Sequence, residues 1–190
     1  GKDTVIVTNN GYALRFNTDE IPEFGLKTGG VKGIKLGDDD RVNSAFVISE
    51  NKEYLSIFTD RNTAKRIKIE DIDMSSRAKK GSLIIKSPKS KKYSIFKVFN
   101  ISSRSIVGIV DGQIGYLKSS DINIMDKQST GSVFTKKNVD NIFIVTKLKE
   151  IKSDEVKEQK EKKKEEVKRE ETKKEEKQLT MSDFFEEFKI

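Results

Sequence analysis

The sequence predicts an all-β protein of three repeated units, each about 50 residues long, followed by a charged tail that is helical or disordered. Three turn residues, Gly11, Asn62 and Gly112, lie 51 and 50 residues apart, and each separates two short apolar segments. Glycine and asparagine tolerate the positive φ that a tight hairpin needs. A second set of glycines returns at the same two spacings, namely Gly30, Gly81 and Gly131. Such a period indicates a propeller or a solenoid, whose units bury their faces against their neighbours.

Each unit is expected to contain four strands, with unit boundaries at about 1–50, 51–100 and 101–149. In the first hairpin Leu14 and Phe16 alternate with the polar Arg15, as in a half-buried strand. A third strand should follow the second glycine, as VKGIKL, SLIIK and SVFT. A fourth should end the unit, as RVNSAFVI, YSIFKVF and VDNIFIV. Pro22 and Pro88 then fall in loops.

The composition excludes several classes of site. Among the 190 residues there are no cysteines and no histidines, so disulfides, thiolate or imidazole metal sites and His- or Cys-based triads are ruled out. This composition fits a reducing cytoplasm. No apolar run approaches the roughly 20 residues that span a bilayer, and no signal peptide is visible. The three consecutive acids Asp38, Asp39 and Asp40 are expected to form a solvated turn rather than a metal site. Because the chain starts at Gly1 without a methionine, we expect a fragment of a longer protein.

The basic charge is concentrated before the tail. Residues 1–150 carry 26 Lys and Arg against 18 Asp and Glu, a net charge of +8, whereas residues 151–190 carry 12 against 13. Between residues 74 and 110 there are nine basic residues and no acidic one. A stretch of one sign creates a field whose usual partner is a polyanion, although a solubilising loop has the same composition.

The motifs TNNGYALRF, EIPEFGLKTGGVKGIKL and DDDRV together resemble one blade of the C-terminal domain of bacterial type IIA topoisomerase A subunits. The segment SRAKKGSLIIKSPKSKKYSIFKV resembles the second blade of the topoisomerase IV A subunit more than that of gyrase. The resemblance covers residues 1–149 and weakens in the third unit, where Tyr116 replaces the arginine that follows the hairpin. The gyrase box Gln-Arg-Arg-Gly-Gly-Lys-Gly has no full match; the nearest segment is 29–33, which lacks the paired arginines.

The resemblance implies a β-pinwheel, a propeller-like disc whose blades exchange a strand, present here as a partial or degenerate disc. It also implies a rim that binds and bends duplex DNA without reading its sequence, assisting relaxation and decatenation by a parent enzyme in the cytoplasm and nucleoid. The fragment itself should be non-catalytic and bind no cofactor, while the parent uses ATP and Mg²⁺ and pairs with the topoisomerase IV B subunit, in an A2B2 assembly. The expected DNA contacts flank the glycine loops or occupy the basic stretch, as Lys27, Lys32, Lys35, Arg77, Lys79, Lys80, Lys86, Lys89, Lys91 and Lys92.

Other side chains have structural interpretations. Arg15 and Arg66 are expected to form salt bridges between blades, with Asp19 or Asp71 as partners, in preference to DNA contacts. The four tyrosines should pack in strands rather than stack on nucleic acid. Two alternatives are also open: the domain is a propeller-like scaffold for protein interactions, or it is the C-terminal domain of a gyrase A subunit.

The tail divides into a Lys- and Glu-rich linker, residues 150–178, and a short amphipathic tip, residues 179–190. Four apolar residues of the tip share one face of a helix, at spacings i, i+3, i+4 and i+7: Met181, Phe184, Phe185 and Phe188. With Gln178, the first three also match the spacing of a sliding-clamp-binding box. The tip is therefore expected to dock on the parent protein or on a clamp or other replication partner, unless it has no role.

Overall fold

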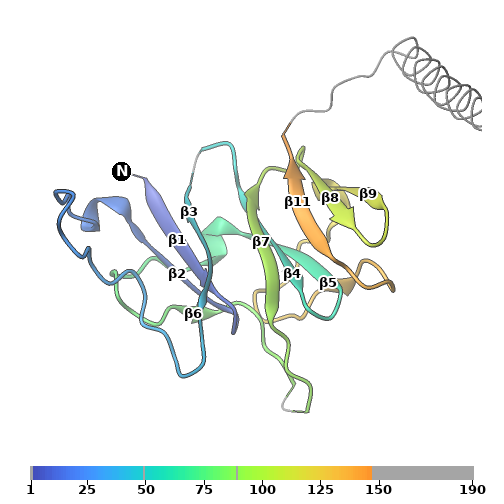
Figure 1. Cartoon of the computed structure of the whole chain (residues 1–190), viewed down its shortest axis with the longest axis horizontal. Helices are drawn as coiled ribbons and strands as arrows, with labels where there is room; N and C mark the ends of the chain where they lie inside the picture. Colours follow the sequence, from blue (N-terminus) through green and yellow to red (C-terminus); the bar gives the residue numbers. More distant parts are fainter. Residues whose placement is uncertain (1, 49, 89, 147–190) are drawn as a thin grey trace, which may run out of the picture. The chain divides into compact units, whose positions relative to one another are not determined.

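The computed structural model describes residues 2–48, 50–88 and 90–146, which form three antiparallel sheets and three short 3₁₀ helices (Figure 1). The elements are β1 (Asp3–Thr8), β2 (Tyr12–Asn17), η1 (Thr18–Glu20), β3 (Val42–Val47), β4 (Tyr54–Thr59), β5 (Thr63–Lys68), η2 (Ile69–Asp71), β6 (Ser82–Leu83), β7 (Ile95–Ile101), β8 (Ile106–Val110), β9 (Ile114–Lys118), η3 (Ser119–Asp121), β10 (Ser132–Val133) and β11 (Asn141–Val145). The all-β prediction is confirmed. The linker and tip, with Gln178, Met181, Phe184, Phe185 and Phe188, lie outside the described residues.

Each unit starts with the predicted hairpin, formed by β1 and β2, β4 and β5, or β8 and β9. The three turn residues have positive φ, of 85° at Gly11, 55° at Asn62 and 88° at Gly112. A 3₁₀ helix follows each hairpin and is closed by a backbone bond from the next isoleucine, as in Ile72 N–H to Ile69 C=O at 3.1 Å. The repeat therefore reflects one backbone path followed three times.

The third strand of a unit completes the sheet of the unit before it. β6 pairs with β2, and β10 pairs with β5, so the strand exchange that the resemblance implied is confirmed. Both short strands follow a glycine with positive φ, 80° at Gly81 and 89° at Gly131. A Cβ added to Gly131 would lie 2.7 Å from the carbonyl oxygen of Ala64, and one added to Gly81 would overlap the carbonyl of Ala13. Only glycine allows the two backbones to approach this closely.

The strand expected at residues 31–36 was a wrong prediction, since this segment belongs to no sheet. A strand needs an edge to pair with, and β6 and β10 find theirs on β2 and β5 of the preceding unit. Residues 31–36 instead bond to the next unit's loop, through Lys35 N–H to Lys79 C=O and Ala78 N–H to Gly33 C=O, both 2.9 Å long. The expected fourth strands are present as β3, β7 and β11.

Two of the three hydrophobic clusters lie at the seams between units, and the third lies within the first unit. At the first seam Val5 and Val7 of β1 pack in one cluster with Leu55 and Ile57 of β4. At the second, Phe58 and Ala64 join Val107, Ile122 and Ile142 of the third unit. The Phe58 ring also contacts the Phe99 and Phe134 rings edge to face, with ring centroids 6.1 and 5.4 Å away. Neighbouring units therefore share the two larger apolar clusters.

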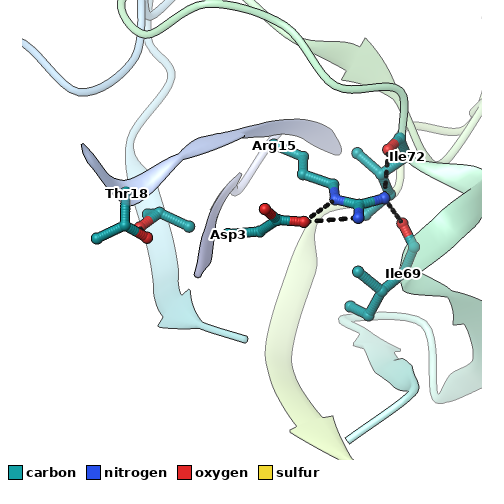
Figure 2. A network of polar contacts seen from close by, with 6 residues as sticks. Asp3, Arg15, Thr18, Ile69 and Ile72 are labelled. Atoms are coloured by element: carbon teal, nitrogen blue, oxygen red, sulfur yellow. Dashed lines mark hydrogen bonds and ion pairs between the residues drawn. The ribbon is translucent and has the colours of Figure 1, made fainter. Parts of the chain in front are cut away.

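An arginine crosses each seam. Figure 2 shows the Arg15 guanidinium between the Asp3 carboxylate and the second unit, where Nη1 donates to the carbonyls of Ile69 and Ile72 at 3.1 and 3.3 Å. Its Nε and Nη2 donate to Asp3 Oδ2 at 2.8 and 2.6 Å. The side chain thus ties β1 and β2 to the η2 turn of the next unit.

Arg66 crosses the second seam in a similar way but without a carboxylate partner among the described residues. It is 6% exposed, and its Nε and Nη2 donate to the carbonyls of Ile122 and Ser120 at 2.7 and 3.3 Å. The Tyr54 ring lies 4.8 Å from the guanidinium carbon. Both arginines join neighbouring units, but they do so by hydrogen bonds to backbone carbonyls of the 3₁₀ turns. The predicted salt bridges between blades, with Asp19 or Asp71, were therefore wrong, and the ion pair of Arg15 is with Asp3 of its own unit.

The equivalent position of the third unit, Tyr116, is 62% exposed. The expectation that all four tyrosines pack in strands was therefore wrong here. Tyr93 also differs from this expectation, because it is half-buried in the loop before β7. Tyr12 and Tyr54 begin strands β2 and β4, in partly buried positions.

We expect Arg66→Met to lower the free energy of unfolding by about 2–3 kcal/mol, because the carbonyls of Ile122 and Ser120 lose their donor in a buried seam. Tyr116→Met is the matched control in the third unit and should change stability by less than about 0.5 kcal/mol. Chemical denaturation at low protein concentration measures both. Equal losses for the two variants would show that the arginine does not hold the seam.

Candidate nucleic-acid interface

The structure brings two glycine loops of neighbouring units side by side. The backbone bonds between Lys35 and Lys79 and between Ala78 and Gly33 hold residues 32–35 against residues 78–79. Lys32, Lys35 and Lys79 are all exposed. Basic side chains that are about 45 residues apart in the sequence therefore lie close together at the first seam.

Arg77 has a different environment from these lysines. Its backbone N–H donates to Glu20 Oε2 at 2.8 Å, and its side chain donates to the carbonyls of Glu20 and Lys32 at 3.2 and 2.5 Å. The residue is half-buried. Arg77 thus joins the two loops, and part of its hydrogen-bonding capacity is already used within the protein.

Beside this loop pair lies a cavity of about 600 Å³ that carries three lysines from three segments, Lys80, Lys86 and Lys92. The rings of Tyr12 and Tyr93 and two aspartates, Asp38 and Asp40, also line it. Lys80 Nζ lies 4.3 Å from the centre of the Tyr12 ring, which positions the ammonium group by a cation–π contact. The Asp40 carboxylate accepts bonds from the backbone N–H groups of Asn10 and Arg41, at 3.0 and 2.9 Å.

We call the exposed lysines of the loop pair and the cavity the basic rim: Lys32, Lys35, Lys79, Lys80, Lys86 and Lys92. Within residues 2–48, 50–88 and 90–146, the ion pairs involve Arg15, Lys68, Lys127 and Lys137, and none includes a rim lysine. Of the remaining predicted contacts, Lys27 and Lys91 lie exposed on separate turns, whereas Lys89 lies outside the described residues.

The loop contact recurs at the second seam, where Lys86 N–H donates to Gln128 C=O at 3.1 Å. The neighbouring cation, Lys127, was missed by the sequence analysis, although its place before Gly131 matches the loop that holds Lys79 and Lys80. Its Nζ donates to the Asp71 carbonyl at 2.9 Å and pairs with the Asp73 carboxylate at 3.2 Å. The charge of Lys127 is therefore partly neutralised within the protein, and Lys127 is not counted in the basic rim.

A buried lysine supports this third-unit loop. Lys65 on β5 is 1% exposed, and its Nζ donates to the carbonyls of Asp126, Lys127 and Ser129 at 2.9, 2.8 and 2.7 Å. Desolvation by burial lowers the pKa of Lys65 to about 8, and the nearby Asp126 charge opposes that shift. Leu14 occupies the equivalent position on β2. Hydrogen bonds from a buried lysine therefore hold the loop at the second seam, whereas the first seam has a buried apolar side chain at this position.

A larger cavity, of about 890 Å³, is less suited to a polyanion. Its charged lining includes Lys2, Lys52 and Lys68, but also Glu50, Glu53 and Glu70. Opposite charges of equal number cancel most of the field at such a site.

Among the described residues no group of three or more acidic side chains is arranged to hold a metal ion. Asp38 and Asp39 are exposed, whereas Asp40 is buried at the turn that starts at Gly37, where Asp40 N–H donates to the Gly37 carbonyl at 3.3 Å. The structure places the three acids in the predicted turn, but only Asp38 and Asp39 are solvated, because the buried Asp40 carboxylate accepts bonds from backbone N–H groups. No helix in the described part of the chain is long and apolar enough to cross a membrane.

Three units with exchanged strands and a cationic edge define a propeller-type repeat domain whose exposed lysines can neutralise phosphates. The family described as "DNA gyrase C-terminal domain, beta-propeller" matches residues 2–49 and 53–100, and the chain belongs to this family. The matched segments correspond to the first two units, where the sequence resemblance was also strongest.

The relatives of this chain include A subunits of DNA topoisomerase 4. The A subunit of DNA topoisomerase 4 from Streptococcus pyogenes is 41% identical over 102 residues, which are 54% of this chain and 12% of that protein. The Streptococcus pneumoniae protein of the same name is 31% identical over 169 residues, covering 80% of this chain and 20% of that protein. The predicted resemblance to the A subunit of topoisomerase IV is confirmed. The chain spans at most about a fifth of the length of these relatives.

Solved structures agree with the fold. A crystal structure of the C-terminal domain of DNA topoisomerase IV has a TM-score of 0.70 and 27% identity, over 76% of this chain and 46% of that one. A DNA gyrase A C-terminal domain has a TM-score of 0.66 at 19% identity, over 75% of this chain and 50% of that one, which supports the fold alone. The predicted β-pinwheel is therefore confirmed.

Lys65 predicts an unusual pH dependence. Because its pKa is about 8 in the folded chain and 10.5 without burial, the unfolded chain binds more protons between these values. The free energy of unfolding of the wild type, relative to Lys65→Met, should therefore rise as the pH increases from about 8 to about 10. Denaturant titrations of both proteins at several pH values measure this difference. A fall over the same range would show that the three carbonyls raise the pKa instead.

Proposed function

We propose that this domain binds the sugar-phosphate backbone of duplex DNA through the basic rim, as the C-terminal domain of a topoisomerase IV A subunit. The observation that carries the proposal is the pairing of glycine loops across the first seam, which gathers exposed lysines that form no ion pair among the described residues. Lysine contacts to phosphate release condensed counterions, so binding weakens steeply as salt is added.

Sequence-independent recognition follows from the residues available. The rim consists of loops and short strands, and the described residues contain no helix longer than a 3₁₀ turn that could enter the major groove. Lysines on loops contact phosphates, which position a duplex without reporting its sequence. We therefore infer that the domain responds to the course of the duplex, its bend or a crossing, rather than to a base sequence.

The parent protein would use this contact to hold one duplex while other domains cut and reseal DNA. We infer that it is an ATP- and Mg²⁺-dependent type II topoisomerase that works with the topoisomerase IV B subunit, in an A2B2 assembly, on cytoplasmic DNA in the nucleoid. The chain itself would contribute binding and no catalytic group. These inferences rest on the family and on the names of the relatives.

The tail has a separate proposed role in recruiting a partner. Gln178, Met181, Phe184 and Phe185 have the spacing of a sliding-clamp-binding box, and the neighbouring Phe188 extends the apolar face. This contact would link the topoisomerase to replication and leave the basic rim free for DNA. Binding of the chain to a purified clamp, lost with Phe184→Ala and Phe185→Ala together, tests this role.

We expect replacement of Lys35, Lys79 and Lys80 by Gln to weaken duplex binding and flatten its salt dependence. Three lost phosphate contacts should make the slope of log affinity against log salt shallower by roughly 2–3. Arg77 is left intact because its contacts to Glu20 and Lys32 hold the loops together. Fluorescence anisotropy with a random-sequence duplex over a salt series measures the slope.

The matched control replaces Lys2, Lys52 and Lys68 by Gln, which removes the same charge from the larger cavity. Its slope should stay close to that of the wild type. If both triple variants lose the same slope, binding depends on net charge alone, and the rim is not the DNA site.

A further inference from the structure

The cavity beside the paired glycine loops contains two acidic groups that the backbone of a duplex does not need. Asp38 and Asp40 line this cavity of about 600 Å³ together with Lys80, Lys86 and Lys92. Phosphates of a duplex would bind the three ammonium groups, but the two carboxylates would repel them, because like charges at close range oppose each other. Binding of a DNA backbone therefore leaves the acidic part of the cavity without a role.

The Asp40 carboxylate is fixed through one oxygen and free at the other. The residue is 9% exposed, and its Oδ1 accepts from the backbone N–H groups of Asn10 and Arg41 at 3.0 and 2.9 Å. Its second oxygen, Oδ2, forms no hydrogen bond or ion pair with the part of the chain that the structure describes. Because a largely buried carboxylate is stabilised by further donors, Oδ2 is an acceptor that a ligand in the cavity can use.

The walls of the cavity come from both units of the first seam and are held together by backbone bonds. Ile84 N–H donates to the Gly11 carbonyl at 2.8 Å, which joins the strand of one wall to the hairpin of the other. Between the charged groups the lining is apolar, with the side chains of Leu83 and Ile85 and the ring of Tyr93. Pre-formed cavities of this size, with apolar walls and a few polar groups, are typical of sites for small organic ligands.

We propose that this cavity binds an unpaired nucleotide whose base carries an exocyclic amino group. The three lysines would hold the phosphate, Asp40 Oδ2 would accept from the amino group, and the apolar walls would contact the base ring. The base edges of a duplex are already paired, so only an unpaired nucleotide can present its base edge and its phosphate to one cavity. A free nucleotide and an unpaired nucleotide of a single strand share this chemistry. The inference does not rest on duplex binding.

The free carboxylate oxygen determines which bases fit. A carboxylate only accepts hydrogen bonds, and cytosine presents its N4 amino group where thymine presents the O4 carbonyl oxygen. Cytosine would therefore donate to Asp40, whereas thymine would place one acceptor against another. The site should prefer cytosine to thymine at equal phosphate charge, so this preference is independent of the general attraction between lysines and nucleic acid.

Fluorescence anisotropy of the full 190-residue chain with labelled single strands of about six deoxycytidines or six deoxythymidines tests the proposal. The wild type should bind the cytidine strand at least about fivefold more tightly. Asp40→Asn keeps an oxygen for the N–H groups of Asn10 and Arg41 and replaces Oδ2 by an amide NH₂ group. Because this donor matches thymine O4, the preference should be reversed in the variant. Equal binding of both strands by the wild type overturns the proposal, whether or not the variant folds.

Asp39→Asn is the matched control, because it removes the same charge from the same turn, and Asp39 is exposed and does not line the cavity. Asparagine also tolerates the positive φ of 56° at this position. The control should keep the preference of the wild type. A preference that Asp40→Asn leaves unchanged, or that both variants lose equally, would overturn the proposal.

Competition with dCTP and dTTP, which carry equal charge, identifies the source of the nucleotide. Stronger displacement of the cytidine strand by dCTP supports the proposal and shows that a free nucleotide is sufficient. Equal displacement by both, with the strand preference intact, supports it and assigns the site to a nucleotide within a strand. The salt series with a duplex measures the basic rim separately, so absence of the cytosine preference would leave the proposed duplex contact standing.

Discussion

Two backbones meet at each seam of this domain at a point where no Cβ fits. Gly81 lies against the Ala13 carbonyl and Gly131 against the Ala64 carbonyl, both with positive φ. This close approach lets the third strand of one unit enter the sheet of the preceding unit, and it brings the seam carbonyls within reach of Arg15 and Arg66. The apolar clusters at the seams then form from residues of both units. The fold thus depends on joints between units more than on the stability of any one unit.

The candidate function follows from the same joints. The loop that leads into each exchanged strand must lie against the previous unit, and lysines on both loops are thereby brought to one outer surface, as Lys35 and Lys79 are. Rigid backbone contacts fix the spacing of these charges at each seam, while the lysine side chains remain free to follow a phosphate chain. Arg77 and Lys65 contribute to the loops from within, since both donate to loop carbonyls. A surface built in this way can bind a long polyanion but cannot distinguish one base sequence from another.

Local signals allowed much of the fold to be predicted. The hairpins, the positive-φ positions and the number of units follow from the spacing of Gly11, Asn62 and Gly112, because turn chemistry is encoded in a few adjacent residues. The partners across the seams could not be read in this way. The sequence marks Arg15 as polar in an apolar strand, but whether it meets a carboxylate or a carbonyl depends on how the next unit packs. The wrong prediction of a strand at residues 31–36 has the same cause. A strand forms only where the edge of a sheet is available for pairing, and the position of that edge depends on how other parts of the chain pack.

Only part of the candidate site could be predicted from the sequence. Charge counts identify a basic stretch, yet they do not separate free lysines from cations used within the protein. Lys80 and Arg77 are neighbours in that stretch, but the first faces a cavity and the second joins two loops. Lys65, buried under the third-unit loop, has no distinguishing signal beyond its place in an apolar strand. These differences between basic residues arise from tertiary contacts, which cannot be deduced from the composition.

Native-state hydrogen exchange tests most directly whether the exchanged segments are an integral part of the fold. The amides of Ile84 and Met125, which donate to Gly11 and Arg66 across the seams at 2.8 and 3.0 Å, should exchange with the same free energy as the β4 amides of Leu55 and Ile57. That result would show that seams and hairpins unfold as one cooperative unit. Exchange of Ile84 and Met125 through local openings of much lower free energy would contradict the account, because the units would then be stable without their joints.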